Sequence, residues 1–150
     1  SIEGMYVSFQ MEGLGSTFNF TKDTEISLGA PKEGPMAGLL FYETPKPKLM
    51  KAIKLLADAQ SEVADVGAAL RLHRINSNKA RQLLGTIYLP NSILQVDADA
   101  PVADKSAYTA LVVRRLWLKE GPHLVLNSDY GATDVPIPSS LVGAKVKLTR

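Results

Sequence analysis

Residues 109–128 read TALVVRRLWLKEGPHLVLNS, and they carry the clearest structural signal in the sequence. The first half is rich in β-branched and aromatic residues, which favour strands, and the segment Glu120-Gly121-Pro122 is typical of a tight turn. The stretch therefore predicts a β-hairpin. A three-residue turn gives three cross-strand pairs, which are Lys119 with His123, Trp117 with Val125, and Arg115 with Asn127.

Period-two alternation divides this hairpin into two faces. The apolar face, which we expect to be core, consists of Leu116, Leu118, Leu124 and Leu126. The other face combines one indole with cationic and hydrogen-bonding groups, namely Arg115, Trp117, Lys119, His123 and Asn127. Such a face can stack a nucleobase on Trp117 while the cations contact phosphates, which predicts that Trp117 is at least partly exposed. The alternative is that Trp117 packs beneath another element, because the only Trp of a domain is usually buried.

Two further groups of basic residues favour the same interpretation. One lies at the start of a predicted helix, where free N–H groups and ammonium groups attract anions, and consists of Lys48, Lys51 and Lys54. The other flanks a predicted hairpin tip and consists of Arg71, His73, Arg74, Lys79 and Arg81. The leading prediction is therefore a non-enzymatic module that binds nucleic acid, DNA or RNA, in single-stranded form. The competing interpretation is a set of solvated charges neutralised by acidic elements.

Charge is distributed unevenly along the chain, and this supports an alternative function. Residues 1–43 have a net charge of −4, residues 44–96 a net charge of +5, and the whole chain +2. An acidic N-terminal third can pair with the basic middle of a neighbouring copy, and unprotected strand edges invite such pairing. The alternative prediction is a structural or assembly subunit that forms a homo-oligomer or joins a larger complex.

Catalysis has less support in the sequence. Asp97, Asp99, Asp129 and Asp134 can gather around a hard divalent cation, which gives a metal-assisted hydrolase as a second alternative. Their spacing matches no calcium loop. With two His and no Cys, the chain lacks the ligands for a His or Cys zinc site. We therefore predict no cofactor and favour a protein that is not an enzyme.

The hydrophobic pattern predicts many short strands and one principal helix. The expected strands cover residues 6–9, 17–20, 25–28, 38–42, 70–75, 82–89, 92–96, 109–119, 123–128, 135–137 and 144–148, with a turn at 29–35 and a hairpin joining 70–75 to 82–89. The helix is expected near residues 47–66, on a stripe of apolar residues at spacings of three, four and seven. We see no internal repeat. The predicted fold class is α+β, a mainly antiparallel sheet or partly closed barrel with this helix against it.

Composition indicates one domain over residues 1–150, because 45% of the residues are hydrophobic and 21% are charged. Residues 1–4 ahead of Met5 have two interpretations, a vector-derived remnant or native sequence. No apolar run is long enough to span a membrane. The absence of cysteine fits a reducing compartment, so the expected location is cytoplasmic, with a mature secreted or excised periplasmic domain as alternatives.

Overall fold

The computed structural model describes residues 1–12, 16–44, 71–119, 121 and 123–139. Its strands are β1 (Ile2–Met5), β2 (Phe9–Met11), β3 (Asn19–Phe20), β4 (Glu25–Gly29), β5 (Leu39–Glu43), β6 (Leu72–Ile75), β7 (Lys79–Val96) and β8 (Thr109–Leu118). A single turn of 3₁₀-helix covers Tyr130–Ala132. The prediction of a β-rich protein is confirmed.

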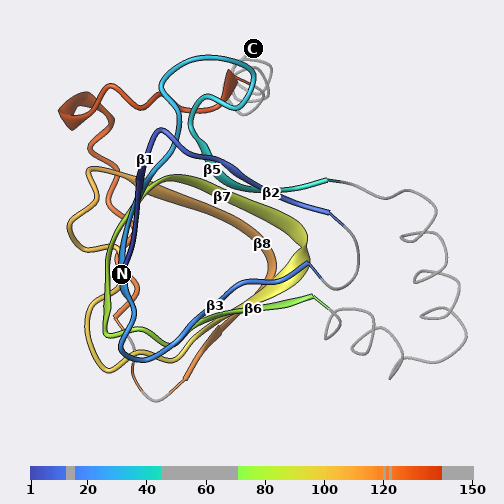
Figure 1. Ribbon diagram of the computed structural model, residues 1–150, viewed down its shortest axis with the longest axis vertical. Helices are drawn as coiled ribbons and strands as arrows, with labels where there is room; N and C mark the ends of the chain where they lie inside the picture. The colour runs from blue at the N-terminus through green and yellow to red at the C-terminus, as the bar shows by residue number, and fades with distance from the viewer. Residues whose placement is uncertain (13–15, 45–70, 120, 122, 140–150) are drawn as a thin grey trace, which may run out of the picture.

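The strands form a three-sided parallel coil, a β-solenoid. Every ladder between the named strands is parallel. The first side stacks β1, β4 and the start of β7; the second stacks β2, β5, the middle of β7 and the first half of β8; the third stacks β3, β6, the end of β7 and the second half of β8. Figure 1 looks along the coil and shows its triangular outline, with β7 running around all three sides.

The corners of the coil follow from local sequence. Gly85 lies between the first and second sides with φ of +130°, a conformation that side-chain-bearing residues rarely adopt. The register of β7 against β8 shifts between Leu89 and Ile93, and Pro90 lies at this shift. Proline cannot donate to a ladder, so it favours such a break. These two interruptions let one 18-residue strand turn twice.

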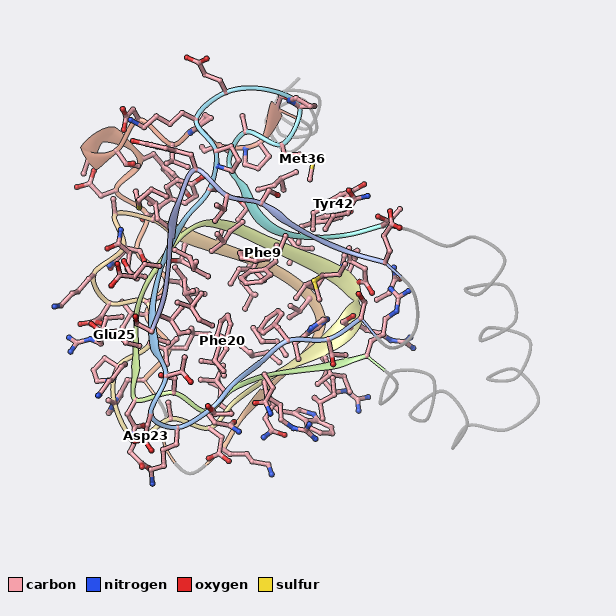
Figure 2. All side chains as sticks on the ribbon, viewed as in Figure 1. Phe9, Phe20, Asp23, Glu25, Met36 and Tyr42 are labelled. Carbon is pink, nitrogen blue, oxygen red and sulfur yellow. The ribbon has the colours of Figure 1, made fainter. Side chains whose placement is uncertain are left out.

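The core consists of columns of side chains that repeat from coil to coil. On the third side, Phe20, Ile75 and Val96 occupy equivalent ladder positions and are all buried. Phe41 and Ile87 form a similar column on the second side. Figure 2 shows Phe9 and Phe20 inside the triangular outline and Asp23 and Glu25 outside it. Parallel pairing keeps like positions in line, so each added coil buries the inward residues of the one before it.

The predicted fold class is wrong in the direction of pairing, because the sheet is parallel and curled rather than mainly antiparallel. Consecutive strands lie on different sides of the coil and pair with strands one coil away. The helix expected at 47–66 and the strand expected at 144–148 lie outside the described residues. Within the described ranges, the 3₁₀ turn is the only helical element named, and no helix has the length and apolarity to span a membrane.

Both predicted hairpins are also wrong, although most of their strands exist. The second half of β8 lies beside β7, so Trp117 neighbours Gln95 and not Val125. Leu124 bridges Val102 on the first side. Likewise β6 runs parallel to the end of β7 and does not fold back on residues 82–89. Turn composition and alternation are the same at a hairpin and at a coil corner, which explains both errors.

Candidate interaction surfaces

Among the described residues, β8 is the last strand of the coil, and several apolar side chains in and after it are exposed. Leu116 and Leu118 continue the columns of Leu94 and Val96, which are both fully buried. Leu116 is nevertheless 36% exposed and Leu118 is 52% exposed. Leu126, which follows β8, is also exposed. The prediction of core positions is therefore wrong for Leu116, Leu118 and Leu126, because in the described part of the chain no further strand covers this end of the columns. Leu124 is half-buried and packs against the core.

The backbone of β8 is also open along one edge. The amide of Lys119 donates to the carbonyl of Val96. The backbone N–H and C=O groups of Lys119, and of every second residue before it in β8, therefore face β7. The N–H and C=O groups of Leu116 and Leu118 consequently point away from β7. Among the described strands, β8 pairs with β7 alone. This end therefore presents unpaired backbone groups together with exposed leucines, and we call it the β8 end.

The opposite end, formed by β1 and β2, is apolar as well, and we call it the β1 end. Ile2, Met5, Tyr6 and Phe9 are exposed there. Phe9 stacks on Phe41 with ring centroids 5.1 Å apart and is still 38% exposed. Solenoids usually carry a polar cap at each end, and the described residues of both ends lack one.

The two ends differ in charge. The β8 end carries the exposed cations Arg114, Arg115 and Lys119 and no acid within 109–119. Residues 1–12 at the β1 end carry Glu3 and Glu12, both exposed, and no Lys or Arg. The two ends therefore differ in the charge of their described strands, although the cations at the β8 end do not belong to residues 44–96, the segment that the sequence predicted to be basic.

Trp117 lies on the outer face of the third side, beside Gln95 and two strands from Arg74. It is 38% exposed, which confirms the prediction of partial exposure. Arg74, Lys119 and His123 are also exposed. The outer face therefore combines an accessible indole with cations, although the predicted hairpin that suggested it does not form.

The other predicted nucleic-acid residues have different surroundings. Asn127 donates from Nδ2 to the carbonyls of Asp104 and Ser106, and Arg81 is paired with Asp104. Lys79 is exposed and neighbours Glu25 across the ladder. Lys48, Lys51 and Lys54 lie outside the described residues.

Arg71 belongs to a buried polar cluster that the sequence did not reveal. Its guanidinium pairs with Glu43, whose side chain is fully buried at the end of β5. Glu43 Oε1 also accepts from Ser92 Oγ at 2.8 Å, and Oε2 accepts from the Asn91 amide at 2.9 Å. These hydrogen bonds link the end of β5 to Asn91 and Ser92, at the second corner of β7. Arg71 is 5% exposed, so its charge is directed inward to Glu43.

His73 is buried beside this cluster. Its Nδ1 accepts from the Phe18 amide at 3.2 Å, and its ring stacks on Phe18 with centroids 4.6 Å apart. The pKa of the imidazole is lowered to about 4, chiefly by burial; the charge of Glu43 opposes this shift and the charge of Arg71 adds to it. His73 is therefore neutral near pH 7.

This burial predicts a pH dependence of stability. In the unfolded chain the histidine pKa is about 6.5. Between pH 6.5 and 4 the imidazole of His73 is therefore protonated in the unfolded state and neutral in the folded state. We expect the His73 contribution to be fully present above pH 6.5 and to fall by about 3 kcal/mol as the pH drops to 4. Urea unfolding of the wild type and of His73→Asn across this range measures it. Equal pH slopes in the two proteins would contradict the prediction.

The predicted acidic metal site does not assemble. Asp97 and Asp99 line one pocket with Lys22, and Asp99 forms an ion pair with Lys22 at 3.4 Å. Asp134 instead pairs with Lys32. In the portion of the chain that the structure describes, no three His, Cys, Asp or Glu side chains are close enough to hold a metal ion.

Fold and surfaces together define a three-sided parallel β-solenoid with two apolar ends of opposite charge. Comparison with known proteins adds no relative, since no family model, curated protein or solved structure matches this chain.

Proposed function

We propose that this chain is a non-enzymatic assembly module, which joins protein chains through the open strand edges of its solenoid. The observation that carries the proposal is the exposure of Leu116 and Leu118, which continue columns that are fully buried one coil earlier. An exposed strand edge next to uncovered apolar columns is the ordinary template for adding a further strand. Such an addition would bury both leucines and pair the free backbone groups of β8.

Self-association of the protein tests this function. We expect the wild type to form larger species reversibly as its concentration rises, and Leu116→Lys/Leu118→Lys to weaken the association constant at least about tenfold, because two ammonium groups would be placed in the buried contact. Sedimentation velocity over a concentration series measures both proteins.

Trp117→Lys is the matched control, since it adds a lysine to the same strand on the outer face. We expect it to associate like the wild type. A wild type that stays the same size as Leu116→Lys/Leu118→Lys at every concentration would refute the proposed function.

A second candidate is binding of single-stranded nucleic acid on the outer face of the third side. The observation that favours it is the partly exposed Trp117, with the exposed cations Arg74 and Lys119 on the same side of the coil. Aromatic side chains stack bases of any sequence, while cations follow the phosphates.

Trp117→Ala tests the second candidate. We expect it to weaken binding of a fluorescent single-stranded oligonucleotide by about 1–3 kcal/mol while changing the urea midpoint little, because the indole is not part of the core. The wild-type affinity should also fall steeply with salt. Anisotropy titrations at two salt concentrations measure both effects, and an absence of binding at low salt would eliminate this candidate.

A further inference from the structure

We propose that the partner at the β8 end is the β1 end of a second copy of this chain, so that copies stack head to tail along the solenoid axis. This inference rests on the proposed assembly function and specifies its partner. Three features of the described residues support it: matching strand direction, matching apolar columns and opposite charge.

The first supporting feature is the direction of the strands. All the ladders are parallel, so β1 and β2 run in the same direction as β8. A second copy related by translation along the axis, with or without rotation about it, therefore presents its β1 end in the orientation that a further coil of the first copy would have. A copy related by a twofold axis would instead place two β8 strands antiparallel, with their cations together.

The free strand position indicates where the second copy enters. Residues 123–129 run beside residues 102–109 on the first side, as shown by the amide of Val125 donating to Val102 and the amide of Asp129 donating to Ala107. Among the described residues, the coil therefore stops after its first side, and the next position lies on the second side over β8. If β1 of the second copy takes that position, its β2 lies on the third side over the exposed leucines.

In this arrangement the exposed apolar groups cover each other. Phe9 of the second copy faces inward, as in its own stack on Phe41, and lies over Leu116 and Leu118 of the first copy. All three side chains are at least 36% exposed in the single chain, so the contact removes apolar surface from water on both copies.

Charge selects the same pairing. Glu12 follows β2 directly and Lys119 follows β8 directly, so both lie where the chain leaves the side that they would share. Both are exposed. Stacking the β1 end on the β8 end places a carboxylate near an ammonium group, whereas pairing like ends places like charges together. A heterologous contact of this kind does not close, so it continues into a fibre-like row of copies.

A charge swap tests the head-to-tail arrangement. We expect Glu12→Lys alone and Lys119→Glu alone each to lower the association constant about tenfold, because each variant meets like charge when it stacks on itself. Mixing the two variants should restore association, and so should the double variant Glu12→Lys/Lys119→Glu. Sedimentation velocity at fixed total protein concentration gives all four results.

Two variants with the same change in net charge serve as controls, Glu33→Lys for the acid and Arg74→Glu for the cation. Both residues are exposed, and neither belongs to β1, β2 or β8, because Glu33 lies in the turn after β4 and Arg74 in β6. We therefore expect both control variants to associate like the wild type. If both single variants associate like the wild type, or if the double variant Glu12→Lys/Lys119→Glu associates no better than the single variants, the head-to-tail inference falls, although the assembly function stands. A monomeric wild type would overturn both.

Discussion

Glu43→Leu is expected to lower the free energy of unfolding by about 3–5 kcal/mol, among the largest effects of any single substitution in this protein. Glu43 is fully buried and accepts hydrogen bonds from Arg71, Ser92 and the Asn91 amide. Removing the carboxylate leaves a buried guanidinium without a counter-charge, and Arg71 already has two nitrogens, Nε and Nη2, without a partner. Urea unfolding at pH 7 measures the loss.

The double variant Glu43→Leu/Arg71→Met separates the cost of an unpaired charge from the value of the pair. Replacing both charged groups by apolar groups removes the uncompensated charge, so we expect the double variant to recover most of the lost stability. Asp104→Asn, which breaks the partly exposed pair with Arg81, is the control and should cost about 1 kcal/mol or less. A double variant as unstable as Glu43→Leu would show that the hydrogen bonds to Ser92 and Asn91 carry the effect.

Gly85→Ala is expected to cost about 2–6 kcal/mol of stability. Two terms add: a side chain at φ of +130° is strained by about 1–3 kcal/mol, and overpacking costs about 1–3 kcal/mol more. An added Cβ would lie 2.6 Å from the Cβ of Ala30, in the adjacent coil. Because Gly85 forms the corner between the first and second sides, relief of this clash requires neighbouring coils to separate.

Gly34→Ala is the matched control for Gly85→Ala. Gly34 also has a positive φ, +87°, but an added Cβ would meet nothing within 4 Å. We therefore expect a loss of about 1–2 kcal/mol from strain alone. Thermal or urea unfolding compares the two variants, and equal losses would show that backbone conformation, rather than packing between coils, determines the cost at Gly85.

The strands themselves could be predicted from the sequence because their signals are local. Runs of β-branched and aromatic residues located β4, β5, β6 and β8 closely, and glycine with proline located the turn after β4. The pairing could not be predicted in the same way. Ladder partners lie 24 positions apart at Gly85 and Thr109, but 55 apart at Phe20 and Ile75, so no fixed repeat is visible along the chain.

The candidate interaction surfaces also combine features that local sequence predicts with features that only the tertiary structure shows. Alternation correctly placed Leu116 and Leu118 on the opposite face from Trp117, and the sign of the charge in each part of the chain was readable directly. The exposure of Leu116 and Leu118 could not be predicted from the sequence. Leu118 and Val96 occupy the same column, and they differ only in whether a further described strand covers them. Arg71 and His73 resemble surface cations in sequence, and only the fold reveals that Glu43 and Phe18 enclose them.

The sequence by itself therefore determined the β-rich character, the positions of the main strands, the inward and outward faces of β8 and the distribution of charge. These properties depend on side-chain type and on period-two geometry within a few residues. The tertiary structure alone decided that the strands coil in parallel, which residues end the columns, and that acidic and basic groups collect at opposite ends. Those features depend on contacts between residues far apart in the chain, because a strand's partner is chosen by packing across coils and not by its own sequence.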